Sequence, residues 1–294
     1  MTELIAKTTP RHIPLANVFR GILLLRESWA GMVGVTLILG WLFAAVFASV
    51  ISPYPPNATL LPFVLPGTAA PDGGVFWLGT DHIGRDILSR ILWGSRTVLI
   101  YASLATATAN IVGIVLGLVA GYYRGWVDEA LSRLADIVLS FPVMVLYIII
   151  IAILGASALN IILAVTFITA PAVMRIVRGL VLDVRERDYI AAAQMRGENP
   201  WFIMFVEILP NVRGPLIVEG CLRMGYVTIT IGTLGFLGLG LPPPDPDWGG
   251  MINETRSMAL VFPHMTLFPS LAISSLVLGL NLLADGIREI SLNT

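Results

Sequence analysis

Lysine and cysteine are nearly absent from this sequence of 294 residues. Its single lysine, Lys7, lies in the segment LIAKTTP, with no glycine beside it. A P-loop needs a lysine directly after a glycine-rich turn to reach nucleotide phosphates, so the chain cannot hydrolyse ATP by that mechanism. Its single cysteine, Cys221, cannot form a disulfide within the chain, and its apolar neighbours indicate a small packed side chain.

The residues that usually build an active site are equally scarce. His12, His82 and His264 lie in three different segments, and the chain holds neither H-E-x-x-H nor G-x-S-x-G. These absences argue against a zinc-protease centre and against a serine nucleophile on a strand–helix turn. We therefore expect no catalytic residue, no metal site and no cofactor in this chain. The net charge of −1 provides no basic field for a nucleic acid.

Charge of either sign is also low. Charged residues make up 13% of the chain, against 56% hydrophobic residues and a mean hydropathy of +0.83. Soluble domains average about 25% charged residues. The composition therefore predicts an all-α, polytopic membrane protein.

Six apolar runs are long enough to cross a membrane as helices, since about 20 residues at about 1.5 Å each span the hydrocarbon core. The run 137–174 is too long for one span, and GASALN at 155–160 divides it into a hairpin of two helices. The first run is also too long for the core of a cleavable signal, so we expect it to be retained. Closely spaced glycines in TLGFLGLGL at 233–241 predict close helix packing. The six predicted spans are 32–51, 97–123, the two halves of 137–174, 210–241 and 257–284.

Lysine and arginine are distributed unevenly between the two sides of these spans. With a cytoplasmic N-terminus, thirteen lie in cytoplasmic segments and four in external ones, while Arg223 is inside a span. Because positive residues favour the cytoplasmic side, both termini are predicted to be cytoplasmic. The chain then divides into a cytoplasmic segment 1–28, a first span with the start of an external loop at 29–75, and a core of five spans at 76–294. Its longest cytoplasmic loop covers about 175–213.

Ionisable residues inside the predicted spans are few. Glu219 and Arg223 are spaced i,i+4 near the inner surface, a spacing at which they can pair with each other. Asp285 lies where the last span meets the cytosol, and His264 lies near the outer mouth. In a secondary transporter, such residues would be candidate proton or ion relays. Their scarcity and the lack of predicted broken-helix pairs argue against that class, which stays open as an alternative.

One polar segment, YIAAAQMRGENPWFIMFVEILPN at 189–211, lies between two apolar spans. Its three alanines favour a helix and keep one side thin enough for another backbone to approach. Gly197 is a natural helix terminator, and Pro200 prevents continuation. The segment therefore predicts a short helix outside the bilayer, which either docks onto a partner or merely covers the cytosolic ends of the spans.

This segment resembles the EAA loop of ABC-importer permeases, whose pattern is E-A-A, three residues, G, nine residues and I-x-L-P. Gly197 and the Leu-Pro pair fall at the family's spacing, whereas Ile208 is displaced by one residue. Ala191 replaces the family's glutamate, which removes any polar contact that this glutamate would make. The resemblance implies a coupling helix that binds an ATPase subunit through the residues at Ala191, Ala192, Ala193, Arg196, Gly197, Leu209 and Pro210.

Four further stretches resemble the C-type permease of the dipeptide, oligopeptide and nickel branch, in the same order. They cover nearly everything after residue 76, and 20–55 resembles that subunit's N-terminal extension. The resemblance implies a type I ABC-importer permease fold in the bacterial cytoplasmic membrane. It also implies a B-type permease as partner in a heterodimer, two cytosolic ATPase subunits that hold ATP and Mg, and an extracytoplasmic solute-binding protein. The stretches are WLGTDHIGRDILSRILWGSR, GYYRGWVDEALSRLADIVLSFP, FLGLGLPPPDPDWGGMI and LFPSLAISSLVLGLNLLADGIRE.

The external loops are the candidate contact for that binding protein. The prolines of LPPPDPDWGG predict a stiff extended path. The candidate docking residues are Asp81, Arg85, Asp86, Asp245, Asp247 and Trp248. Alternatively, Asp81 and Asp86 cap turns, with Asp86 at the start of a short helix, and the prolines only stiffen a gate. The cargo stays open among di- and oligopeptides, nickel, glutathione and other small solutes, because specificity is expected to lie in the binding protein.

Overall fold

The computed structural model describes residues 28–242 and 245–293, so the expected cytoplasmic segment 1–28 lies outside the described residues except for Ser28. Helices dominate, and β1 (Thr68–Ala69) and β2 (Val75–Phe76) form one short antiparallel hairpin. Around the polar segment the helix is irregular, with a π-helical stretch η2 (Ile203–Ile208) and a 3-10 turn η3 (Leu209–Asn211). A further 3-10 turn is η4 (Arg256–Met258). The α-helices are α2 (Trp29–Ile51), α3 (Ile87–Tyr123), α4 (Gly125–Ser140), α5 (Val143–Leu154), α6 (Ala158–Arg185), α7 (Asp188–Met195), α8 (Pro200–Phe202), α9 (Arg213–Phe236), α10 (Trp248–Thr255) and α11 (His264–Asn293).

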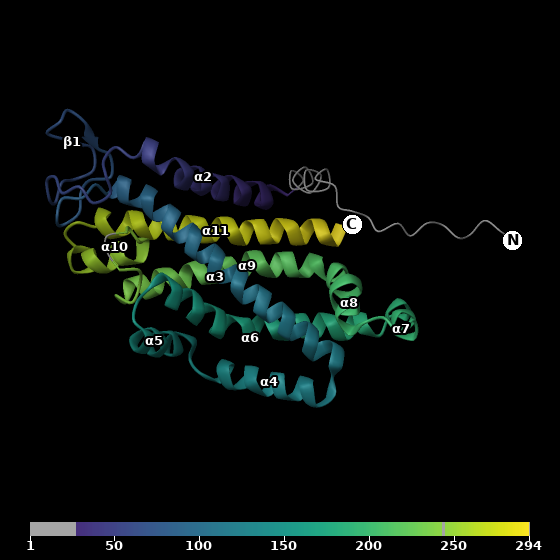
Figure 1. Cartoon of the computed structure of the whole chain (residues 1–294). Helices are drawn as coiled ribbons and strands as arrows, with labels where there is room; N and C mark the ends of the chain where they lie inside the picture. Colours follow the sequence, from purple (N-terminus) through teal and green to yellow (C-terminus); the bar gives the residue numbers. More distant parts are fainter. Residues whose placement is uncertain (1–27, 243–244, 294) are drawn as a thin grey trace.

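Four helices, α2, α3, α6 and α11, are long and apolar enough to cross a membrane. The passes number six if each of two bent pairs is one span, namely α4 with α5 and Pro200–Asn211 with α9. Figure 1 shows the helices running between two ends of the bundle, with α7 and α8 at one end and β1 and α10 at the other. α2 begins and α11 ends at the α7 end. The all-α, multi-span prediction is confirmed in this bent form.

The third pass differs from the prediction. α4 and α5 meet at 88°, and the break lies at Phe141 and Pro142. A residue before proline is driven out of the helical region, and Phe141 is extended, with a ψ of 144°. The expectation of unbroken spans is therefore wrong, because a proline within an apolar run leaves the hydropathy unchanged. The predicted hairpin between α5 and α6 is confirmed: Gly155 has a φ of 85° at the end of α5, and Ser157 caps α6.

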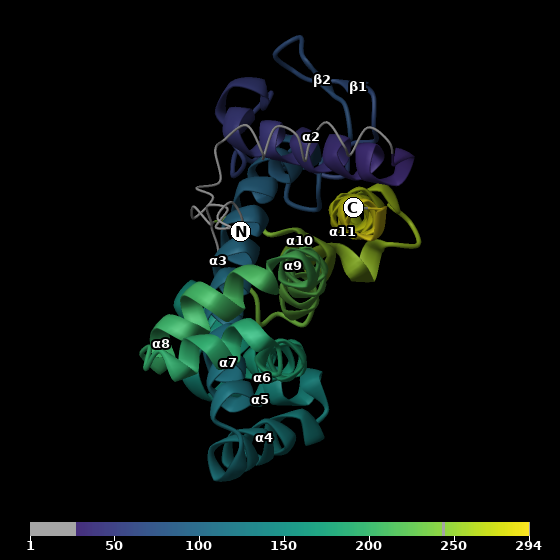
Figure 2. The ribbon, with the colours of Figure 1, turned by 90° about the vertical axis from the view of Figure 1, so that its right-hand side faces the viewer.

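α3 and α6 pack closely at the centre of the bundle, between α2 at one edge and α4 at the other (Figure 2). Glycines four residues apart on α3 face valines at the same spacing on α6. A Cβ built on Gly117 would lie 2.6 Å from the Cβ of Val177, so the contact leaves room for hydrogen only. Small residues at this spacing let two membrane helices approach closely. The pairs are Gly113 with Val173, Gly117 with Val177 and Gly121 with Val181.

The first span packs on the last one. A Cβ on Gly34 of α2 would lie 2.5 Å from the backbone nitrogen of Leu283 on α11. The indole N–H of Trp41 donates to the Ser275 hydroxyl at 3.0 Å, which ties the same two helices together. Much of the remaining surface of α2 is exposed and apolar, as a lipid-facing helix requires.

α10 rests against the end of α9, where the sequence predicts close packing. A Cβ on Gly235 would lie 2.8 Å from the backbone nitrogen of Gly250, and a Cβ on Gly240 would lie 2.6 Å from the Cα of Gly235. These glycines therefore let the turn after α9 fold back onto the helix. The packing prediction is confirmed.

Candidate functional site

α7 follows α6 almost directly at one end of the bundle (Figure 1). Only Glu186 and Arg187 separate the two helices. The first part of the predicted cytoplasmic segment 175–213 is helical, because α6 continues through Arg175 and Arg178. A short connection of this kind leaves α7 little freedom to move independently of α6.

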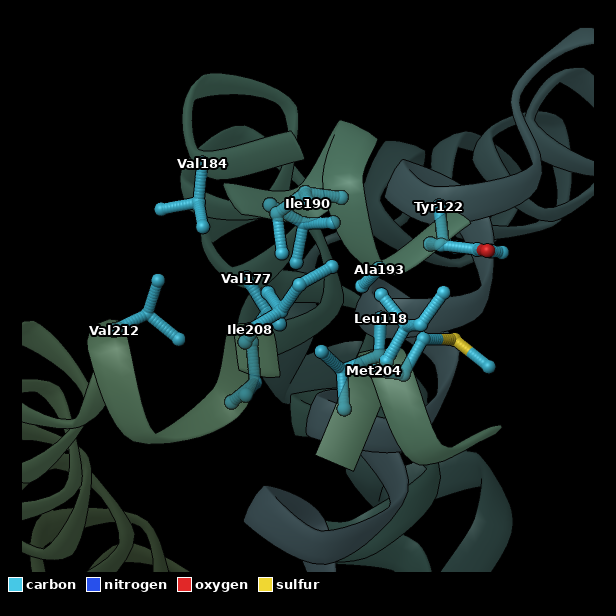
Figure 3. Packing of buried hydrophobic residues seen from close by; sticks show 12 residues of the cluster. Leu118, Tyr122, Val177, Val184, Ile190, Ala193, Met204, Ile208 and Val212 are labelled. Atoms are coloured by element: carbon cyan, nitrogen blue, oxygen red, sulfur yellow. The ribbon is translucent and has the colours of Figure 1, made fainter. Parts of the chain in front are cut away.

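The inner face of α7 is buried in an apolar cluster. Ile190 and Ala193, three residues apart, are both fully buried, and Figure 3 shows them packed among side chains of α3, α6 and η2. Residues at i and i+3 share one face of a helix, so α7 is held to the α3–α6 pair along that face. The buried cluster consists of Leu118, Tyr122, Val173, Val177, Val181, Val184, Ile190, Ala193, Ile203, Met204, Ile208 and Val212.

The outer face of α7 is open. Ala191 is exposed, Ala192 is half-buried, and Met195 is 85% exposed. Arg196, also exposed, forms an ion pair with Glu198 at 2.6 Å just past the helix. The outer face of α7 thus carries small side chains and, at its end, the long apolar side chain of Met195. A face of this shape can fit into a shallow groove.

Gly197 ends α7 in the way that the sequence predicts. Its φ is +74°, a conformation that favours glycine. The backbone N–H of Gly197 donates to the carbonyl of Gln194 at 3.0 Å, and that of Glu198 donates to the carbonyl of Ala193 at 3.3 Å. This pair of bonds is the Schellman motif, which satisfies carbonyls left free at the helix end. A side chain on Gly197 would meet no atom of this chain within 4 Å, so it would project outward.

The Leu209-Pro210 pair lies where the polar segment turns into the fifth pass. Pro210 has no N–H, so the helix cannot continue regularly, and η2, η3 and a bend of 75° into α9 result. The side-chain amide of Asn211 donates to the carbonyl of Glu207 at 2.6 Å and so satisfies an acceptor at the break. Ile208 is fully buried and holds this turn against the cluster beneath α7.

Ion pairs at this end join α6 to the neighbouring elements. The Arg178 guanidinium on α6 donates to both carboxylate oxygens of Asp128 on α4, one of them at 2.7 Å. Arg175 pairs with Asp136 farther along α4. Arg124, between α3 and α4, pairs with Glu186 at 2.7 Å. The bidentate Arg178–Asp128 contact has the geometry expected of a strong pair.

A buried charge cluster lies at the opposite end. The Asp81 carboxylate contacts Arg85 Nε at 2.6 Å and Arg90 Nη1 at 3.4 Å. Glu254 on α10 contacts the same two guanidinium groups, that of Arg90 at 3.5 Å. Arg90 is only 3% exposed, so its charge requires these partners. The cluster joins the segment before α3 to α10, which makes Asp81 and Arg85 internal contacts of this chain.

Asp86 is the N-cap of α3. Its carboxylate accepts the backbone N–H of Ser89 at 2.7 Å, and burial raises its pKa above the ordinary value. The predicted cap is confirmed. The predicted short helix is not separate, because it continues into the 37 residues of α3.

The remaining candidate docking residues divide into buried and exposed ones. Trp248 is fully buried, and its indole N–H donates to the carbonyl of Ile91 at 3.0 Å. Asp247 is 4% exposed and caps α10 by accepting the N–H of Gly250 at 2.9 Å. Burial raises the pKa of Asp247 to about 6. Asp245 is exposed, so its side chain is open to a partner.

The contact between Arg90 and Glu254 could not have been predicted from the sequence. Arg90 and Glu254 are 164 positions apart, so no local pattern signals their contact. The glycine stripe of α3 could have been found from its four-residue spacing in GIVLGLVAG. The Glu219–Arg223 pair predicted from i,i+4 spacing on α9 is confirmed.

Known proteins resemble this chain over most of its length. Residues 113–292 match the family described as binding-protein-dependent transport system inner membrane component. The glutathione transport system permease protein GsiD of Pectobacterium atrosepticum is 44% identical over 213 residues, which cover 72% of this chain and 71% of that protein. The dipeptide transport system permease protein DppC of Alkalihalophilus pseudofirmus is 38% identical over 265 residues, covering 90% of this chain and 86% of that protein. The di/tripeptide permease protein DppC of Pseudomonas aeruginosa is 35% identical, with 90% of each chain covered.

The family match covers more than half of the chain, and the DppC proteins align with nearly all of it. The bent passes, the short helix α7 and the Leu-Pro break after it all lie within the matched region. The chain belongs to the inner-membrane components of binding-protein-dependent transport systems and is a multi-pass permease of the peptide family of ABC importers.

Proposed function

We propose that this chain is the C-type permease subunit of an ATP-driven importer for di- or oligopeptides in the bacterial cytoplasmic membrane. A B-type permease completes the translocation path as a heterodimer. Two cytosolic ATPase subunits, which hold ATP and Mg, drive the pair, and an extracytoplasmic binding protein delivers the solute. In this arrangement α7, the start of α2 and the end of α11 face the cytoplasm.

The observation that carries the proposal is the construction of α7. Its inner face is held by Ile190 and Ala193, and its outer face, with Ala191 and Met195, contacts nothing in the described chain that would bury it. A helix that only covered the ends of the spans would have no need of an exposed methionine at its tip. This favours docking over covering, and we assign the outer face to one ATPase subunit.

The same contacts provide a route for motion. When ATP closes the two ATPase subunits, α7 is displaced together with α3 and α6, because its buried face is packed against both helices. The ion pairs Arg178–Asp128 and Arg175–Asp136 extend this unit to α4. We propose a rigid-body rocking of these helices between inward-open and outward-open states.

The cargo assignment draws on the curated relatives. The names of the DppC proteins state dipeptide or di/tripeptide transport, and that of GsiD states glutathione transport. Dipeptides and glutathione share a peptide bond, a free carboxylate and a free amine. Peptides are therefore the proposed class, with glutathione, nickel or another small solute as the alternative cargo for the same type of importer.

The end opposite α7 is the proposed contact for the binding protein. Asp245 is exposed there, and the Glu254 side chain is 32% exposed at the edge of the charge cluster. Asp86, Asp247 and Trp248 act in this proposal by holding α3 and α10 in place, because their side chains are buried.

The test is affinity purification of this chain from its native membrane in mild detergent, followed by mass spectrometry and reconstitution into vesicles. We expect two P-loop ATPases, a second permease and a binding protein to co-purify, and peptide uptake to require ATP. The ligand retained by the binding protein would identify the cargo. A chain that purifies alone and transports without ATP would contradict the proposal and support an ion-driven transporter.

A further inference from the structure

A groove of about 480 Å³ lies between α2 and α3, and no residue of α7 or of the charge cluster lines it. Leu42 and Val46 line it from α2, and Leu99, Ile100 and Leu104 line it from α3. Four of these side chains, those of Leu42, Val46, Ile100 and Leu104, are between 49% and 55% exposed. The groove is thus open to the surroundings of the bundle and apolar along its walls.

Arg96 is the one charged residue among those that line this mostly apolar groove, and Ser103 is its other polar lining residue. Arg96 is exposed and has its guanidinium carbon 5.6 Å from the ring centroid of Trp93. No carboxylate in the described part of the chain pairs with it. Arg85, which precedes α3, and Arg90, in the first turn of α3, are both held in the cluster with Asp81 and Glu254. Among the described residues, Arg96 thus has no carboxylate partner, whereas Arg85 and Arg90 do.

The position of Arg96 along the axis of the bundle is where the headgroup of a bound lipid is expected. Val46, on the facing wall, lies five residues before the end of α2, or about 8 Å inside that end. Tryptophan is enriched at the membrane interface, and an arginine near the end of a span can extend its charged group to that interface; Trp93 and Arg96 lie next to each other near the start of α3. From Arg96 to Leu104 the α3 wall is about 12 Å long at about 1.5 Å per residue, and it runs toward the membrane interior.

We propose that this groove binds one glycerophospholipid, with its phosphate on Arg96 and one acyl chain against Leu42, Val46 and Leu104. Charge complementarity supports the contact between Arg96 and the phosphate. A guanidinium is positively charged, and its parallel N–H donors match the spacing of phosphate oxygens. The apolar walls then accommodate the acyl chain that continues from the same molecule. Bound in this way, the lipid would fill the space between the first span and the core helix α3. The inference requires membrane insertion only and is independent of the cargo and of the ATPase subunits.

The test uses the whole importer, purified in mild detergent and reconstituted with phosphatidylglycerol that carries a photoreactive group on one acyl chain. We expect cross-links to α2 and α3 around the groove. Arg96→Gln should lower the phosphatidylglycerol retained in native mass spectra by about tenfold, as the loss of one charge-assisted contact implies. Arg96→Lys should keep most of it.

Two further variants control for folding and for general charge effects. Val46→Trp keeps Arg96 and adds bulk at the exposed wall, so it should reduce acyl-chain cross-linking on its own. Arg256→Gln is the matched control, because Arg256 also stacks on an aromatic ring, that of Phe236 at 5.7 Å, but does not line the groove. The proposal is overturned if neither Arg96→Gln nor Val46→Trp changes retention or cross-linking, or if Arg256→Gln has the same effect. It is also overturned if residues of the groove are found cross-linked to the second permease instead of to lipid. The groove would then be a contact between the two subunits.

Discussion

The backbone conformation of Gly197 bears on the proposed contact between α7 and an ATPase subunit. Its φ of +74° disfavours other residues by about 1–2 kcal/mol, and a side chain there would project away from this chain. Gly197→Arg should therefore reduce peptide uptake severalfold while the ATPase subunits stay active. The added bulk and charge would separate α7 from the ATPase surface on which we propose that it docks. Gly197→Asn, which tolerates positive φ, is the control and should retain more uptake. Uptake at the normal level by the arginine variant, with normal amounts of protein, would contradict the coupling assignment.

Asp247 predicts a specific pH dependence. Its pKa is raised from 3.8 to about 6, so the folded state binds more protons than the unfolded state between these values, and stability falls as pH rises through that window. The full effect is at most about 3 kcal/mol. Asp247→Asn keeps a capping oxygen and removes the titration. We therefore expect wild type to gain stability relative to this variant when pH is lowered from 7.5 to 5. Thermal unfolding in detergent at both pH values measures this, and a constant difference would refute it.

Asp81 is the shared anchor of two guanidinium groups at the end opposite α7. It is 5% exposed, and Asp81→Asn would leave the buried charge of Arg90 with Glu254 alone. Breaking a buried pair in this way costs about 3–5 kcal/mol. We expect faster hydrogen exchange in the segment 52–86 and in α10, with α7 unchanged. Equal exchange in both proteins would show that the cluster does not hold α10 in place.

At the scale of elements, the α3–α6 contact depends on missing side chains. Gly117→Ala would place a Cβ 2.6 Å from that of Val177, and overpacking of this kind costs about 1–3 kcal/mol. Gly179→Ala on α6 is a matched control, since a Cβ there meets nothing within 4 Å. The melting temperature should fall for Gly117→Ala and stay near the wild-type value for Gly179→Ala. An equal fall for the two variants would argue that the close approach of α3 to α6 is not the cause.

At the scale of the whole molecule, α4 has to follow α6 if the helices rock together. Asp128→Arg and Arg178→Asp should each place like charges against each other and reduce uptake severalfold, while ATP hydrolysis continues. The double exchange restores opposite charges across the same contact and should recover much of the uptake. Uptake is measured in vesicles for wild type, the two single variants and the double variant. The recovery in the double variant measures the coupling between Asp128 and Arg178. If both single variants transport normally, the pair does not transmit motion.

Much of the architecture follows from the order of residues alone. The low charge and the apolar runs require helices in lipid, because an unpaired backbone cannot be tolerated there. Gly197 and Pro200 predict where α7 ends, since both act through their own backbone geometry. The hairpin at Gly155 and the cap at Asp86 are local for the same reason. Resemblance of the loop pattern then identifies the family.

The sequence by itself thus determined the membrane class, the helical segments between their local breaks and the place of α7. Only the tertiary structure decided which side chains of the loops are covered: Trp248 and Asp247 are buried, Asp245 is exposed, and Arg90 meets Glu254. It also decided the angle of 88° at the break that Pro142 marks between α4 and α5, and that α6 is the helix that packs on the glycines of α3. The physical reason is that a uniformly apolar helix has no periodic pattern to mark its packed face. Which face is covered depends on elements more than a hundred residues away.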